Sequence, residues 1–255
     1  MPAASGWTRQ QLLVAFALYC RLPFGRLHYR NPEIVRFANA IGRSPSALAM
    51  KLTNIASLDP AITSTGRAGL RGASANDRAM WEEMQSDWEG FAVESQRAVG
   101  EAMDAAEPDD EVVGEADADR VGEDRATQTT TRIGQSFFRA TVLSAYNGRC
   151  CITGLSLPTL LRAGHIIPWH VDKSNRVNPR NGLLLSVLHE RAFDAGLITI
   201  NDDMTVRVSC RQAVDNDDFY TTSVSRYDQQ PINLPEKFGP DQKFLAYHRE
   251  NIFQQ

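Results

Sequence analysis

An acidic segment in the middle of the chain constrains its fold more than any other feature. Residues 101–127 contain 11 Asp and Glu side chains against 2 Arg, a net charge of −9. The segment has no aromatic residue, and most of its few apolar residues are Ala and Val, a composition that cannot bury a core. We therefore predict a solvated linker over 101–131, between a domain at 1–100 and a domain at 132–255. A second interpretation is an acidic decoy that competes for a basic surface.

The charge outside this segment changes the expected partner. The whole chain of 255 residues carries −4, so the remainder carries +5, and two mildly basic parts suit an anionic partner such as nucleic acid. No apolar run approaches the roughly 20 residues that span a membrane. The first residues show no secretory signal, and the four cysteines form no Cys-x-x-Cys pair. We expect a reduced, cytoplasmic protein without a membrane partner.

The first hundred residues show the periodicity of helices. Apolar residues recur at helical spacing after Thr8, and N-cap residues predict helices over 8–22, 31–42 and 44–59. The short turn between the last two gives them the spacing of a helix-turn-helix unit, whose second helix enters a major groove with its N-terminal end. The residues at that end that we predict to contact DNA are Arg43, Ser44, Ser46, Ala47 and Lys51. A helical bundle that binds nothing is the alternative interpretation.

The rest of this half gives weaker signals. Residues 61–75 are Gly-rich and carry Arg67 and Arg71, which would contact phosphates if the segment forms a wing. An ordinary flexible loop is equally compatible. The next helical segment contains Trp81, Trp88 and Phe91 at a spacing that predicts a buried face rather than a platform for bases.

The second half changes from helix to mixed elements. A helix is predicted over 134–150, followed by a short strand over 149–154 and a second strand over 163–170. A loop full of turn-forming residues covers 171–181. The pattern then predicts a helix over 181–196 and a hairpin over 197–209.

This order, with His165 on the second strand, Asn181 before the helix and His189 within it, resembles the HNH nuclease family. The resemblance covers residues 134–210, and the tail over 234–253 is similar to the ending of restriction-endonuclease-like members. It implies an α+β protein: an N-terminal helical domain of helix-turn-helix or winged-helix type, the acidic linker, and a C-terminal domain with the ββα-metal fold.

The resemblance also implies roles for these side chains. His165 would be the general base that activates water, because an imidazole accepts a proton near neutral pH. Asn181 would hold the strand that carries His165, and His189 would ligate a divalent ion, Mg²⁺ or Mn²⁺, that stabilises the phosphate. The expected reaction is hydrolysis of phosphodiester bonds in double-stranded DNA, and a homodimer would allow cleavage of both strands.

Some positions depart from the family pattern or leave alternatives open. Many members carry Asp or His directly before the base, whereas this chain has Gly164. Asp194 is a candidate to supply the missing ligand, and a helix cap is the alternative for it. Arg176 and Arg180 are candidates to clamp the DNA backbone, although either one also suits a solvated loop. We predict no structural zinc, because Cys150, Cys151 and Cys210 form no convincing zinc set.

Three classes of function therefore stay open. The favoured one is a metal-dependent restriction-type endonuclease in which the N-terminal half selects a sequence or a modified base. The second is a DNA-binding regulator whose HNH-like half is inactive, as the glycine before the base would allow. The third is a nicking or repair nuclease that acts on DNA structure.

Overall fold

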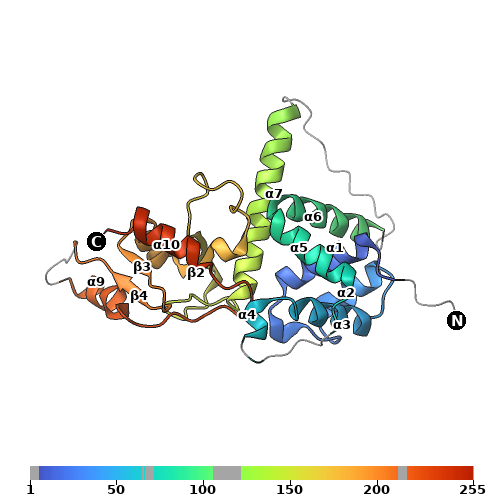
Figure 1. The fold of residues 1–255 in the computed structure, drawn as a ribbon, viewed down its shortest axis with the longest axis horizontal. Helices are drawn as coiled ribbons and strands as arrows, with labels where there is room; N and C mark the ends of the chain where they lie inside the picture. Colours follow the sequence, from blue (N-terminus) through green and yellow to red (C-terminus); the bar gives the residue numbers. More distant parts are fainter. Residues whose placement is uncertain (1–5, 65, 67–71, 106–121, 212–216, 255) are drawn as a thin grey trace. The chain divides into compact units, whose positions relative to one another are not determined.

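The structure is a computed structural model that describes residues 6–64, 66, 72–105, 122–211 and 217–254. The chain divides into two compact units, Met1–Phe137 and Phe138–Gln255 (Figure 1). None of the described helices is long and apolar enough to cross a membrane. The predicted Arg67 and Arg71 lie outside the described residues.

The first unit is helical in its described residues. Its elements are α1 (Arg9–Arg21), η1 (Phe24–Arg26), α2 (Pro32–Ala40), α3 (Pro45–Ala56), α4 (Pro60–Thr63), α5 (Ala75–Ser86) and α6 (Trp88–Asp104). The side chains of Thr8, Asn31 and Ser44 accept backbone N–H bonds at the starts of α1, α2 and α3, and proline follows the last two. Such caps satisfy N–H groups that have no partner inside the helix. The predicted starts of these helices are confirmed.

The core of this unit surrounds α1, which is buried from Leu12 to Cys20. The ring of Phe16 packs against Trp81 and Phe91 with centroids 6.5 and 6.3 Å apart. The aromatic residues predicted to be core are therefore buried. The predicted single helix around them is two helices, because Asp87 ends α5 and caps α6 by accepting a bond from Gly90 N at 2.9 Å.

The predicted linker is helical at both ends. Residues 101–104 belong to α6, and 122–131 belong to α7 (Gly122–Ala145). The residues between them, 106–121, lie outside those that the structure describes. The proposed domain limits at 100 and 132 therefore stay a prediction.

The second unit combines two small sheets with helices, so the fold class is α+β as expected. Strands β1 (Leu161–His165) and β2 (Gly182–Ser186) pair antiparallel, with His165 opposite Gly182. Strands β3 (Ile198–Ile200) and β4 (Val206–Val208) form the predicted hairpin. The remaining elements are η2 (Pro158–Leu160), η3 (Pro179–Asn181), α8 (Val187–Asp194), α9 (Asp218–Ser223), η4 (Ser225–Tyr227) and α10 (Gln242–Asn251).

Two predicted elements of this unit are wrong. Residues 149–154 form turns instead of a strand, and the helix predicted from residue 181 begins only at Val187. Residues 182–186 form β2, which is buried along its whole length. A continuous apolar run gives no periodicity that separates a buried strand from a helix, which explains the second error.

The β1–β2 hairpin packs closely on α7 through Gly182. A Cβ atom at this position would lie 2.7 Å from Val142 Cγ2 and 2.8 Å from Phe138 Cζ. Only glycine leaves room for that approach. The contact places Phe138 beside the end of β1, where His165 stands.

Candidate functional site

His165 is the last residue of β1, and its ring is held on three sides. It stacks on Phe138 with centroids 4.0 Å apart and planes 10° apart, and it meets Trp169 in a T-shaped contact with centroids 5.4 Å apart. Its Nε2 lies 2.8 Å from the carbonyl oxygen of Arg176. Because a carbonyl oxygen only accepts, Nε2 carries the proton and Nδ1 keeps its lone pair. Burial lowers the pKa of His165, against the smaller raising effect of the Arg176 carbonyl. The ring is a neutral proton acceptor at neutral pH.

Asn181 fixes the loop that follows His165. Its side chain is fully buried, and Oδ1 accepts a hydrogen bond from Ile167 N at 2.8 Å. Its Nδ2 donates to the carbonyl oxygens of Ile167 at 3.1 Å and Asn175 at 3.3 Å. One amide thus joins η3 to the backbone just after β1. This geometry supports the orienting role that we predicted for Asn181.

A pocket of about 360 Å³ opens beside His165. Its lining includes His165, Gly164, Trp169, Glu190 and Asp194. Glu190 and Asp194 are four residues apart on α8 and therefore share one face of the helix. Glu190 crosses directly over β1, since a Cβ atom on Gly164 would lie 3.3 Å from Glu190 Cγ. The space beside Gly164 is thus taken by an acidic side chain from the helix.

The surroundings of Asp194 disfavour the charge of its carboxylate. The pKa of Asp194 is raised, first by burial and second by the negative charge of Glu190, whereas Arg191 lowers it. Among the residues that the structure describes, neither carboxylate forms an ion pair within 4 Å. Paired carboxylate oxygens with uncompensated charge are a donor set for a hard divalent cation. The residues present therefore fit the metal that the family resemblance implies.

His189 is not among the residues that line this pocket, so the structure does not place it with Glu190 and Asp194, and its role as a metal ligand stays a prediction. Its side chain is buried, Nδ1 lies 2.8 Å from Ser186 Oγ, and the ring packs on Tyr227 at 5.3 Å. Its Nε2 is also buried and has no hydrogen-bond partner among the described residues. The cause is the helix rotation of about 100° per residue, which turns His189 toward the core and its neighbour Glu190 toward the pocket.

His248 lines the pocket but has no nitrogen left for chemistry. Nδ1 lies 2.8 Å from Thr199 Oγ1, and Nε2 lies 3.0 Å from the carbonyl oxygen of Phe193. The ring stacks on Phe193 at 3.6 Å. Burial lowers the pKa of His248 to about 4, so it stays neutral and pins α10 to β3 and α8.

The two arginines near the site differ in their surroundings. The guanidinium of Arg176 lies 5.1 Å over the ring of Trp169, which lines the pocket. Arg180 pairs with Asp241 at 3.2 Å. Arg176 thus borders the pocket, whereas the charge of Arg180 is already partly compensated.

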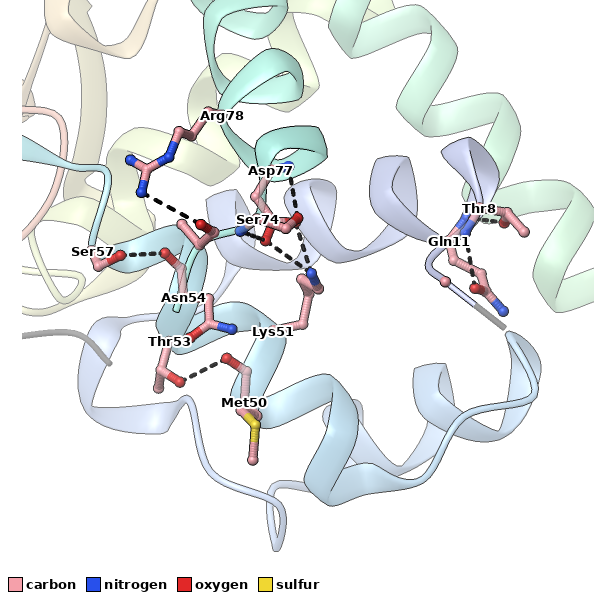
Figure 2. Close-up of polar contacts among 12 residues, drawn as sticks. Thr8, Gln11, Met50, Lys51, Thr53, Asn54, Ser57, Ser74, Asp77 and Arg78 are labelled. Carbon is pink, nitrogen blue, oxygen red and sulfur yellow. Dashed lines mark hydrogen bonds and ion pairs between the residues drawn. The ribbon is translucent and has the colours of Figure 1, made fainter. Parts of the chain in front are cut away.

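In the first unit, two of the cations predicted to contact DNA, Lys51 and Arg43, are engaged within the protein. Lys51 is 6% exposed, and its amine donates to both oxygens of Asp77 at 2.8 and 2.9 Å (Figure 2). Arg43 donates to Gln11 Oε1 and to the carbonyl oxygen of Gly6, both at 2.8 Å. A buried, paired ammonium cannot contact a phosphate, so the prediction for Lys51 does not fit the structure.

The small residues at the start of α3 remain accessible to different degrees. Ser44 and Ser46 are exposed, and Ala47 is half-buried. Ser44 Oγ accepts from Ala47 N at 3.2 Å, so it acts as the cap of α3. Contact of these residues with bases stays a prediction.

Comparison with known protein families matches part of the second unit. Residues 150–201 match a family model, HNH_2, described as HNH endonuclease. No curated protein matches the chain. The matched span contains His165, Asn181, Glu190 and Asp194. The chain therefore carries an HNH endonuclease domain, which implies a phosphodiester hydrolase with a nucleic-acid substrate and, as is general for such nucleases, a divalent metal.

Sequence reasoning missed Glu190. Its signal was present, because it stands four residues before Asp194 and the two share a helix face. The motif drew attention to the histidine beside it instead.

Proposed function

We propose that this chain is a metal-dependent DNA endonuclease of restriction type. The unit at 138–255 hydrolyses the phosphodiester bond, and the helical unit selects a sequence or a modified base. The observation that carries the proposal is the fixed tautomer of His165 in a pocket with two carboxylates.

The geometry supports His165 as the general base. Nδ1 accepts the proton of the attacking water, because Nε2 is already protonated and donates to the Arg176 carbonyl. That carbonyl also stabilises the imidazolium that forms, since it faces a ring N–H that gains positive charge. The stacked ring of Phe138 keeps the imidazole plane fixed during the transfer. General bases of this kind contribute about 10² to 10⁴-fold.

Glu190 and Asp194 are the residues that would hold the cation, Mg²⁺ or Mn²⁺. When bound, the cation supplies charge neutralisation at the scissile phosphate and at the leaving 3′ oxygen. Magnesium sites commonly use one or two carboxylates and complete their coordination with water and phosphate oxygens. Among the described residues no group of three or more His, Cys, Asp or Glu side chains gathers, so water and phosphate oxygens would have to complete the coordination here.

Double-stranded DNA is the proposed substrate. One active site cuts one strand, so we also propose that two copies of the chain act together for double-strand cleavage. Linear product without accumulation of nicked circles supports that arrangement, and nicked product alone favours a nicking nuclease.

Plasmid cleavage with Mg²⁺ or Mn²⁺ tests the proposal. The wild-type chain is expected to convert supercoiled DNA, and His165→Ala is expected to lose about 10² to 10⁴-fold in rate. His170→Ala is the matched control, because His170 is an exposed histidine of the neighbouring loop. Equal rates for wild type and His165→Ala would show that His165 is not the base. A wild-type chain that binds DNA without cutting it would identify an inactive regulator.

Parallel digestion of modified and unmodified genomic DNA tests the selective role of the helical unit. Cleavage confined to one of the two substrates supports recognition of a modification. Equal digestion of both, with discrete fragments, supports recognition of sequence.

A further inference from the structure

The charges of the first unit are segregated along the chain. Residues 9–56 contain seven Arg and Lys side chains and one Glu, whereas residues 57–105 contain nine Asp and Glu and four Arg. The cations therefore belong mainly to α1, α2, α3 and the loops between them. A surface that attracts a polyanion is therefore expected on these elements.

Several of these cations are already engaged. Arg9 pairs with Glu83 and with Glu94, and Lys51 pairs with Asp77. Arg43 is bonded to Gln11 and lies over the ring of Trp7. These side chains hold the helices together, so their charged groups are already engaged within the unit.

The loop between α1 and α2 presents its cations differently. Residues 24–31, which we name the arginine loop, contain Arg26, His28, Tyr29 and Arg30, and all four side chains are exposed. Among the described residues, neither Arg26 nor Arg30 forms an ion pair with a carboxylate. The nearest acidic residue in sequence, Glu33, lies 4.0 Å from Arg21.

Hydrogen bonds to a backbone oxygen within the arginine loop hold it in place. Asn31 caps α2 and donates from Nδ2 to the carbonyl oxygen of Arg26 at 2.9 Å. The backbone N–H of His28 donates to the same oxygen, also at 2.9 Å. Leu27 is buried and anchors the loop in the core. The exposed side chains thus project from a fixed frame, which lowers the entropy lost when they bind.

Tyr29 positions one of the two guanidinium groups. Its ring is 50% exposed, Arg30 Cζ lies 5.5 Å from the ring centroid, and Arg30 Nε donates to Tyr29 Oη at 3.1 Å. Because Nε is bonded to the phenol oxygen, the donors of Arg30 that remain for another group are those on its two terminal nitrogens. A guanidinium fixed in this way offers two parallel donors, the geometry that suits a phosphate.

We propose that the arginine loop binds the phosphate backbone of duplex DNA through Arg26 and Arg30. The inference rests on the proposed function, since the nuclease substrate is the polyanion in question. It moves the backbone contact of the helical unit from α3, where Lys51 is buried, to the loop before α2. The start of α3 is then left for contacts to bases.

Salt-dependent binding of labelled duplex DNA tests this proposal. The full chain carrying His165→Ala is used in EDTA, so that no cleavage occurs. Each phosphate contact contributes about 0.9 to the slope of log K against log salt. Adding Arg26→Ala and Arg30→Ala together is therefore expected to reduce the magnitude of that slope by about 1.8.

A double variant at other exposed arginines, Arg78→Ala with Arg97→Ala, is the matched control. It removes the same charge from the acidic part of the unit and is expected to leave the slope unchanged. Equal slopes for the two double variants would overturn the proposal, whether both change or neither does. Circular dichroism melting checks that each variant is folded.

Two further comparisons separate the possible failures. If the Arg26/Arg30 variant loses binding to polyglutamate and keeps binding to DNA, the loop recognises an acidic protein and the proposal is wrong. If the wild-type chain cuts plasmid and the variant keeps its slope, the loop proposal fails and the nuclease proposal stands. If the slope changes and wild type does not cut, the nuclease proposal fails alone.

Discussion

Substitution of Asn181 by Asp tests whether the buried amide orients the base. Asp has nearly the same shape, and it keeps the oxygen that accepts from Ile167 N. It replaces the nitrogen that donates to the carbonyl oxygens of Ile167 and Asn175 at 3.1 and 3.3 Å. A carboxylate oxygen there faces two other acceptors in a fully buried place. Protonation restores one donor, so the folded protein raises the pKa of the new carboxyl group.

The sign of the pH dependence follows from that shift. The unfolded carboxyl titrates near about pH 3.9. Because the folded state holds the proton to higher pH, stability is greatest below the unfolded pKa and falls as pH rises until the folded pKa is passed. The loss reaches at most about 1.4 kcal/mol for each pH unit. The reference is Asn181→Ala, which has no titrating group and leaves the N–H and C=O of Ile167 unpaired, at a cost of about 1–3 kcal/mol each.

Urea unfolding from about pH 5 to pH 8 measures both variants. The stability of Asn181→Asp relative to Asn181→Ala is expected to fall as pH rises and to level off once the folded pKa of the new carboxyl group is passed. A difference between the two variants that stays constant with pH would refute the reasoning, because it would show that the donor side of the amide is not needed.

Two other predictions concern the pocket. Glu190→Gln and Asp194→Asn are each expected to weaken Mn²⁺ binding, measured by calorimetry, at least about tenfold. His189→Gln is expected to lower the thermal stability and to leave the Mn²⁺ affinity unchanged. The reverse pattern would identify His189 as the ligand. Because burial lowers the pKa of His165, single-turnover cleavage is expected to fall with decreasing pH only below about 6.5, and an apparent pKa above that value would contradict the assignment of the base.

The helices of the first unit were predictable because their signals are local. A cap such as Asn31 or Ser44 followed by proline favours a helix start whatever the surroundings are. The burial of Lys51 and its ion pair could not be predicted from local signals. Its partner Asp77 lies 26 residues away on α5, and only the packing of the helices brings the pair together.

The nuclease site was predictable in kind and not in detail. The spacing of His165, Asn181 and the following helix identified the domain, which the match over 150–201 supports. The helix start was placed five or more residues too early, since the apolar run over 182–186 is a buried strand. A shift of one residue on a helix turns the side chain by about 100°. That rotation explains why Glu190, and not His189, lines the pocket.

The contact between Gly164 and Glu190 limits which substitutions each position accepts. A side chain at 164 would place its Cβ 3.3 Å from Glu190 Cγ, so Glu190 would have to shift by a few tenths of an ångström to make room. Shortening Glu190 first would instead empty the pocket of one carboxylate before another could replace it. Neighbours in contact give non-additive effects, so a change at either position alone is expected to weaken the proposed nuclease. Descendants of this protein are therefore expected to keep both Gly164 and Glu190 or to change both. In the second case, β1 would carry the acidic residue and α8 would carry a small one.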